Sequence, residues 1–371
     1  MVTAGLVDAH AGTTHVVTRL AQQLAESGAR VTVFSAELNA RTSLPDVTPA
    51  KIVSVPFFSF RGRKMVAPSI RRELTSVPAD WVHVHGFWLH PFVSACFAGK
   101  ALDAQILLSP HGMFSQFSFR AHGTRKRIAL RLGFSQALRR IDCFHATSVG
   151  EYEEIRKLGL KQPIHLIPHG IDLPELITSK CHLEEHVLLF LSRLHPKKGL
   201  MLLLEAWGQI AALRPQWRLQ IVGPDEGGHG AELQQFIARR GLPRVSLMGP
   251  CYGAVRDALM RNASLFVLPS YDENFGLVIG EALACETPVL TTTRTPWKML
   301  EAKGCGWCVP ATLESITSAL ATATALDVDK LHEMGRRGRI MINQSFSWSR
   351  VSQRFLERIF DDRSNGIIDH S

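Results

Sequence analysis

Two glutamates that follow a short apolar segment are the residues best placed to bind a ligand. The apolar LFVLPS, residues 265–270, leads into YDENFGLVIGEALA, where Glu273 and Glu281 are separated by seven residues. This pattern predicts that Glu273 lies in a loop and that Glu281 lies about one turn into a helix. A carboxylate that accepts hydrogen bonds from two neighbouring hydroxyls would suit a ribose ring. The alternative is a capping acid at Glu273 and an ordinary surface residue at Glu281.

The backbone between these glutamates could bind an anion. The residues at the expected start of the helix are Asn274, Phe275, Gly276 and Leu277. N–H groups at a helix start have no partners inside the helix, and Gly276 lets the backbone approach a ligand closely. Ligands of parallel sheets bind outside the carboxyl ends of the strands, which is where this loop would lie.

Two cations follow a second apolar segment. After LLFL, the loop SRLHPKKGL holds Arg193 and Lys198 five positions apart. The planar fork of an arginine and the point charge of a lysine could together neutralise a diphosphate without a metal. The alternative is a solvated basic turn. A weaker phosphate-type loop is AHAGTTHVV, where Gly12 precedes the first expected helix, but turn glycines are common.

A histidine and an acidic pair give further candidates. His111, in LLSPHGMFS, follows another expected strand, and its imidazole could donate a hydrogen bond to a substrate hydroxyl or carbonyl. A structural role is the alternative, and for the similarly placed His85 the two interpretations are equal. Asp327 and Asp329 form a D-x-D pattern that marks a metal site in some sugar-transferring enzymes, but here it favours a helix start.

The candidate residues follow strands in a chain where strands and helices alternate. HVVTRLAQQLAESGARVTVFSA predicts a helix that ends near Gly28 and then a strand over residues 31–34. Similar apolar strands recur at WVHVHG, RLQIVG, VSLMG and PVLTT, with helical patterns between them. This alternation predicts an α/β fold with parallel sheets. A length of 371 residues favours two domains, and the polar residues 178–186 form the best linker.

The composition restricts the class of protein. Hydrophobic residues make up 46% and charged residues 20%, which excludes a disordered chain, collagen and a coiled coil. No secretory signal or membrane-spanning segment is visible, so we expect a cytoplasmic protein. Cys305 and Cys308 lack a second pair to complete a zinc site, and reduced thiols are the expectation.

Positive charge is concentrated in the first half of the chain. Up to residue 172 there are 20 basic and 12 acidic residues, against 22 and 21 after it. Residues 47–72 and 111–141 contain no acid and hold six and seven basic residues. Such windows suit an anionic partner, with a solvated surface as the alternative. Nucleic acid is disfavoured because no recognised binding module is present.

Taken together, these motifs resemble the retaining GT-B glycosyltransferases of family 4. The resemblance covers nearly the whole chain and includes SPHGMFS, HATSVGEYEEIRKLG, IPHGID, SRLHPKKGL, the glutamate segment and TPWKML. It implies two Rossmann-like, doubly wound parallel-sheet domains that face each other across a cleft. Residues 1–172 would bind the acceptor and residues 173–345 the nucleotide sugar, while residues 346–371 would return as a helix to the first domain.

The resemblance assigns the diphosphate and the ribose of the donor. Arg193 and Lys198 would hold the diphosphate of a nucleotide sugar with the backbone at residues 274–277, and Gly12 would approach the phosphates from the first domain. Glu281 would bind the ribose.

The remaining two candidates would act on the sugar. Glu273 would contact hydroxyls of the donor sugar, and His111 would line the reacting sugar. With Arg193 and Lys198 they form the expected catalytic set, which needs no metal or other cofactor.

The implied reaction is retaining transfer of a hexose from a UDP- or GDP-sugar to a lipid-linked oligosaccharide, as in bacterial exopolysaccharide and lipopolysaccharide assembly. The basic windows would attach the enzyme peripherally to the anionic inner face of the cell membrane. A nucleotide-sugar 2-epimerase of the same fold is the alternative.

Two features depart from the family pattern. Met1 lies only about ten residues before Gly12, too close for a full strand and loop, so we expect a shortened first strand or a misplaced start. His169 stands where the family more often has an asparagine. Both residue types tolerate turns, so we expect little effect.

Overall fold

The computed structural model describes the chain except for residues 4, 7–11, 38–43, 57, 61–62, 116–133, 176–184 and 361–371. The chain divides into two compact units. The first comprises Met1–Gly170 and Trp348–Ser371, and the second comprises Ile171–Ser347. Much of the second basic window and most of the expected linker lie outside the described residues.

The first unit is built on a parallel seven-stranded sheet in the order β3-β2-β1-β6-β7-β8-β9. The strands are β1 (Val2–Thr3), β2 (Thr32–Glu37), β3 (Lys51–Pro56), β6 (Trp81–His85), β7 (Gln105–Ser109), β8 (Cys143–Ala146) and β9 (Ile164–Leu166), and a separate hairpin is formed by β4 (Phe58–Phe60) and β5 (Arg63–Val66). The helices are α1 (Gly12–Glu26), α2 (Ile70–Thr75), α3 (His90–Ala101), α6 (Ser135–Leu138), α7 (Val149–Lys157) and α14 (Trp348–Phe355), which continues as a π-helical turn over Leu356–Phe360.

Helix α14 belongs to the first unit although it follows the second unit in the chain. It packs against α1, and a Cβ atom at Gly170 would lie 2.2 Å from the Trp348 ring. Only glycine therefore fits where the chain leaves the sheet of the first unit, because a larger residue would displace the tryptophan.

The second unit is built on a parallel six-stranded sheet in the order β12-β11-β10-β13-β14-β15. The strands are β10 (His186–Leu191), β11 (Trp217–Val222), β12 (Val245–Met248), β13 (Leu265–Leu268), β14 (Val289–Thr292) and β15 (Gly306–Val309). The helices are α8 (Leu200–Ile210), α9 (His229–Arg240), α10 (Gly253–Asn262), α11 (Leu277–Ala284), α12 (Leu313–Ala323) and α13 (Val328–Phe346), with 3-10 turns over Pro196–Lys198, Ala211–Leu213 and Lys298–Leu300.

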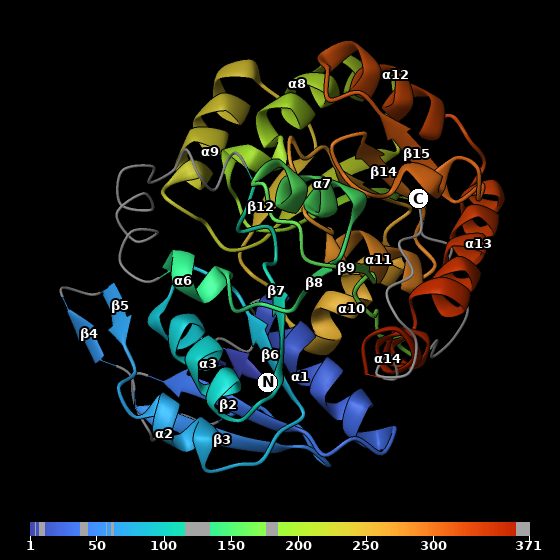
Figure 1. Ribbon diagram of the computed structural model, residues 1–371. Coiled ribbons are helices and arrows are strands. Elements are labelled where there is room, and N and C mark those ends of the chain that lie inside the picture. The colour runs from blue at the N-terminus through green and yellow to red at the C-terminus, as the bar shows by residue number, and fades with distance from the viewer. Residues whose placement is uncertain are drawn as a thin grey trace. The chain divides into compact units, whose positions relative to one another are not determined.

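The elements confirm the predicted α/β class (Figure 1). Strand β13 is apolar throughout, β10 is apolar after His186, and both are buried at most positions, as expected for parallel strands with both faces covered. The D-x-D segment forms a helix start: Asp327 is the N-cap of α13, and Asp329 lies in its first turn. Among the described helices, none combines the length and apolar character that a membrane span requires.

The strand order of the second unit's parallel sheet reverses between β10 and β13. These two strands are hydrogen-bonded neighbours, while β11 and β12 extend to one side and β14 and β15 to the other. Ligands of open α/β sheets bind at such a reversal, outside the carboxyl ends of the strands. The loop that leaves β10 holds Arg193 and Lys198, the loop that leaves β13 holds Glu273, and Glu281 lies in the helix α11 that follows. The fold therefore places these candidates near this position.

Candidate functional site

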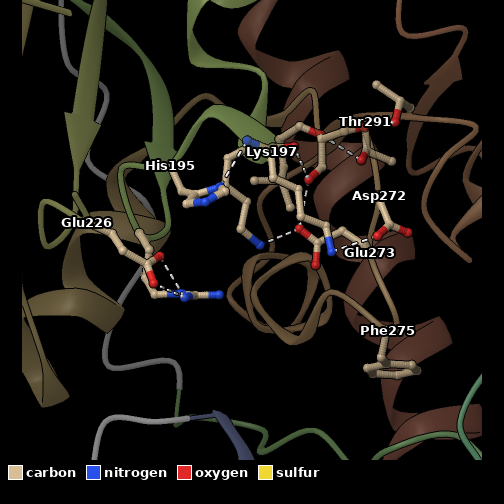
Figure 2. Close-up of polar contacts among 12 residues, drawn as sticks. His195, Lys197, Glu226, Asp272, Glu273, Phe275 and Thr291 are labelled. Carbon is tan, nitrogen blue, oxygen red and sulfur yellow. Dashed lines mark hydrogen bonds and ion pairs between the residues drawn. The ribbon is translucent and has the colours of Figure 1, made fainter. Parts of the chain in front are cut away.

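The loops after β10 and β13 are joined by an ion pair with little exposure. Lys198 Nζ contacts Glu273 Oε1, and Ser270 Oγ donates to the same carboxylate oxygen at 2.9 Å (Figure 2). Both side chains are only 11% exposed. A largely buried charge is costly unless it is paired and hydrogen-bonded, which is how each of these charges is held.

A second set of contacts fixes the same two loops. Lys197 Nζ lies 2.7 Å from Asp272 Oδ2, and the Lys197 carbonyl accepts hydrogen bonds from Tyr271 N–H and Ser270 Oγ. His195 caps the 3-10 turn, because its Nδ1 accepts from the Lys197 N–H at 3.0 Å. The two loops therefore form one connected surface before any ligand binds.

Gly199 allows this close approach. Its φ of +72° lies in the left-handed region, and a Cβ atom would lie 2.0 Å from the carbonyl oxygen of Pro269. Any other residue would be strained and would push the loops after β10 and β13 apart.

Arg193 has a different partner from Lys198. Its Nη1 lies 2.9 Å and 2.7 Å from the two carboxylate oxygens of Glu226, and the side chains are 60% and 45% exposed. Figure 2 shows Glu226 apart from the group around Glu273. An exposed pair of this kind contributes at most about 1 kcal/mol, so the Arg193 guanidinium can exchange its partner for an anion.

The start of α11 is held by Trp297. Gly276 is the N-cap of α11 in a left-handed conformation, with φ +74°. The buried Trp297 indole N–H donates to the Phe275 carbonyl at 2.7 Å, and its ring packs against Phe275 and Phe346. Asn274, half-buried, precedes this turn, and Leu277 is the first residue of α11. The structure thus fixes the segment that the sequence assigned to anion binding.

Glu281 lies in α11 and points at a residue that the sequence analysis missed. Its Oε1 accepts a hydrogen bond from Arg256 Nη1 at 3.0 Å, and its side chain is 16% exposed. Arg256 comes from α10, which packs beside α11. No motif signalled this arginine, because its importance comes only from the packing of the two helices.

His111 lies in a stack of histidines within the first unit. Its Nε2 is 3.0 Å from His85 Nδ1, with the rings 5.3 Å apart and nearly parallel, and the centroid of the His169 ring lies 5.5 Å from that of His111. Burial lowers the pKa of His111 to about 3 and the pKa values of His85 and His169 well below 6.5. The stack is therefore neutral at physiological pH, and His111 offers a neutral imidazole to any ligand.

The loop that carries His111 is held by Glu151, a second residue that the sequence analysis did not single out. Glu151 is 1% exposed, and its Oε1 accepts from the Gly112 N–H at 2.6 Å. Its Oε2 accepts from the N–H and the hydroxyl of Thr147. The motif HATSVGEYEEIRKLG contains this glutamate, so the signal was present without an assigned role.

The remaining candidates have simpler surroundings. Gly12 is the first residue of α1 and is exposed, while the preceding residues 7–11 lie outside the described part of the chain. Within the described residues, no group of three or more histidine, cysteine or acidic side chains could hold a metal ion.

Comparisons with known proteins agree with this arrangement. The family model described as "Glycosyltransferase Family 4" matches residues 11–175, and the one described as "Glycosyl transferases group 1" matches residues 174–341. The chain is 25% identical over 315 residues to a GDP-mannose:cellobiosyl-diphosphopolyprenol alpha-mannosyltransferase of Xanthomonas oryzae pv. oryzae, covering 81% of this chain and 79% of that protein.

Solved structures share the fold over nearly the whole length. Anabaena Alr3699/HepE, in complex with UDP and glucose, has a TM-score of 0.73 at 19% identity and covers 97% of this chain and 98% of its own. WaaG, a glycosyltransferase involved in lipopolysaccharide biosynthesis, has a TM-score of 0.69 at 18% identity, with 98% and 97% covered. The two family models, the relative and the shared fold lead to one assignment: the chain is a glycosyltransferase and belongs to the GT-B enzymes of family 4.

Proposed function

We propose that the protein transfers a hexose from a UDP- or GDP-sugar to a lipid-linked oligosaccharide and retains the anomeric configuration. The observation that supports the proposal is the connected pair of loops at the point where the strand order of the second unit's sheet reverses. There Lys198, Glu273 and Arg193 lie in loops that leave two neighbouring central strands. The position is the one where an open α/β sheet binds a nucleotide.

The diphosphate of the donor would exchange partners with the two cations. Arg193 would release the exposed Glu226, and Lys198 would share its charge between Glu273 and a phosphate oxygen. The N–H groups at the start of α11 would add partial positive charge. These groups would stabilise the negative charge that develops on the departing diphosphate, so the proposal needs no metal.

Glu273 would bind the donor sugar as a hydrogen-bond acceptor. Its Oε1 is already occupied by Lys198 and Ser270, which suits an acceptor of sugar hydroxyls better than a covalent nucleophile. Retention would then follow from attack of the acceptor hydroxyl on the face of the departing group. The bond from the anomeric carbon to the acceptor oxygen forms, the bond to the diphosphate breaks, and a phosphate oxygen takes the acceptor proton. The neutral His111 would line the reacting sugar.

The proposed acceptor is supported by the relative and by charge. The Xanthomonas enzyme is named for transfer to a cellobiosyl-diphosphopolyprenol, and WaaG for a role in lipopolysaccharide biosynthesis. The basic windows in the first half of the chain would attract the protein to an anionic membrane on the cytoplasmic side. Flotation with anionic vesicles at low salt should enrich the protein, and equal flotation with neutral vesicles would contradict membrane attraction by charge.

A nucleotide-sugar 2-epimerase is the less favoured alternative, because both family models describe glycosyl transfer. An epimerase would convert the donor with no acceptor present. Product analysis of the purified protein with UDP-sugars and GDP-sugars, with and without lipid-linked acceptor, separates the two reactions.

The donor site is tested by thermal unfolding with UDP, GDP, ADP and dTDP. A nucleotide at 100 times its dissociation constant should add about 2.7 kcal/mol to the unfolding free energy. The shift should be lost in Arg193→Ala and in Glu281→Ala. Arg218→Ala is the matched control, because Arg218 forms a similar exposed pair with Glu185 at 2.8 Å on β11. If no nucleotide stabilises the wild-type protein, the assignment of this site is wrong.

A further inference from the structure

The Arg256 guanidinium is held from two sides. Its Nη1 donates to Glu281 Oε1 at 3.0 Å, while its Nε and Nη2 both donate to Asp257 Oδ1, at 3.2 Å and 3.1 Å. The guanidinium is planar, so contacts on both edges fix its orientation as well as its position. Asp257, Arg256 and Glu281 therefore form a chain of three charged groups that connects α10 to α11.

These three charged groups engage only one of the two carboxylate oxygens of Glu281. Oε1 is engaged by Arg256, whereas Oε2 accepts no hydrogen bond from any residue in the described part of the chain. The Glu281 side chain is 16% exposed, so its carboxylate is mostly shielded from water while still reaching the surface. A glutamate with one oxygen fixed presents the other in one direction, which is what recognition of a single hydroxyl requires.

The position of Arg256 argues against a purely structural pair. Helix α10 follows β12 and α11 follows β13, and both helices begin beyond the carboxyl ends of the sheet, on the side of the proposed donor site. The Arg256 side chain is 31% exposed, so the pair lies at the surface of that edge and not in the core. An ion pair that only joined two helices would need no second acid to aim the guanidinium.

We propose that Arg256 is a positioning residue: supported by Asp257, it holds Glu281 so that Oε2 accepts a hydroxyl of the nucleotide ribose. The inference rests on the proposed function, because it requires a nucleotide at this site. Arg256 itself makes no contact with the nucleotide in this scheme. Its removal therefore weakens the recognition of that ribose hydroxyl and leaves the binding of the base and the diphosphate unchanged.

The test compares ribonucleotides with their deoxy analogues. Dissociation constants are measured by calorimetry for UDP and GDP and for the 2′-deoxy and 3′-deoxy forms of whichever nucleotide binds. A hydrogen bond to a carboxylate corresponds to about a tenfold preference or more, so the wild-type protein should prefer the ribose form by that factor. Arg256→Met should reduce the preference to about twofold or less, chiefly by weaker binding of the ribose form.

Three variants make the result specific. Arg256→Lys should recover part of the preference, because a lysine can contact Glu281 but cannot also span Asp257 in a planar fork. Asp257→Asn should give an intermediate preference. Arg261→Met removes the same charge five residues further along α10, where Arg261 Nη2 donates to the Glu175 carbonyl, and should keep the wild-type preference.

The outcomes separate this inference from the proposed function. If the wild-type protein binds no nucleotide, or does not distinguish ribose from deoxyribose, the ribose role of Glu281 fails and the inference fails with it. If the wild-type protein discriminates and Arg256→Met weakens all nucleotides equally, the donor site stands but positioning by Arg256 is refuted. A lower melting temperature with an unchanged preference would show a structural role only.

Discussion

Acidification should unfold the first unit before the second, and His145 provides the best-defined contribution. The ring is 2% exposed; its Nε2 donates to the Ile167 carbonyl and its Nδ1 accepts from Ser109 Oγ, both at 2.7 Å. Both ring nitrogens are thus satisfied in the neutral form. Burial lowers the pKa of His145 from 6.5 to about 4, because the charged form would lose its hydration.

The sign of the effect follows from which state binds more protons. Between pH 6.5 and pH 4 the unfolded chain has a protonated His145 and the folded chain does not, so the unfolding free energy falls as pH falls through this window. Moving from pH 7 to pH 5 costs about 2 kcal/mol from His145 alone. His111, with a pKa of about 3, adds about the same amount, and His83, His85 and His169 act in the same direction.

Hydrogen exchange followed by mass spectrometry tests this at pH 7, 6 and 5, corrected for the intrinsic pH dependence of exchange. Peptides from β7 and β8 should lose protection by at least about 4 kcal/mol at pH 5, a large part of the stability of a domain. Peptides from β13 and β14 in the second unit, two strands without histidine, are the internal control. His145→Gln should flatten the pH dependence by about 2 kcal/mol. If β7 and β8 keep their pH 7 protection at pH 5, the argument from buried neutral histidines is refuted.

Three further changes test the second unit. Gly199→Ala should lower the unfolding free energy by about 3 kcal/mol or more in denaturant titrations. Gly241→Ala is the control and should cost about 1 kcal/mol, because Gly241 also has a positive φ but no atom lies within 4 Å of the added Cβ. Equal costs for the two variants would mean that the loops after β10 and β13 do not approach each other tightly at Gly199. Glu226→Gln should raise the nucleotide affinity measured by calorimetry roughly two- to fivefold, because it releases Arg193 from its ion pair. An unchanged affinity would show that the Arg193–Glu226 pair does not compete with the nucleotide. Trp297→Phe should lower the unfolding free energy by about 1 kcal/mol and weaken nucleotide binding, because the indole hydrogen bond to the Phe275 carbonyl is lost. A nucleotide affinity equal to that of the wild-type protein would show that this hydrogen bond does not support the start of α11.

The sequence predicted the fold class and the loops of the second unit because both depend on local patterns. Apolar segments followed by glycine, proline and charge locate the ends of β10 and β13, and the order of elements defines a parallel sheet. The positions of Lys198 and Glu273 at neighbouring strand ends follow from that topology. Their direct ion pair does not, because residues 75 positions apart meet only after the sheet has formed.

The partners of Arg193 and Glu281 could not be predicted for a related reason. Glu226 lies in VGPDEGGHGAEL, a segment that also resembles the family but had no assigned role, whereas Arg256 belongs to a segment with no recognisable motif. Both side chains reach the site only through the packing of neighbouring loops and helices. For the histidine stack, the residues were identified from the sequence but their contact was not. His85 and His111 were each seen as residues after strands, but their contact requires the register of β6 against β7, which places His85 opposite Ser109.

The charges at the reversal of the sheet explain how the site can be stable without a ligand and still bind a diphosphate. Three cations there are each paired with one carboxylate, so the six groups together carry no net charge: Arg193 with Glu226, Lys197 with Asp272, and Lys198 with Glu273. A site with three unpaired cations would repel itself, and its lysines would be costly to shield from water. Pairing removes that cost, but it also means that net charge cannot be the source of affinity. We expect the affinity to come from exchange at the exposed Arg193–Glu226 pair, from a phosphate oxygen that shares the Lys198 charge, and from the N–H groups at the start of α11. The shielded Lys198–Glu273 contact keeps its geometry meanwhile. The contrast between the exchangeable Arg193–Glu226 pair and the fixed Lys198–Glu273 pair is therefore the feature that prepares this surface for a nucleotide.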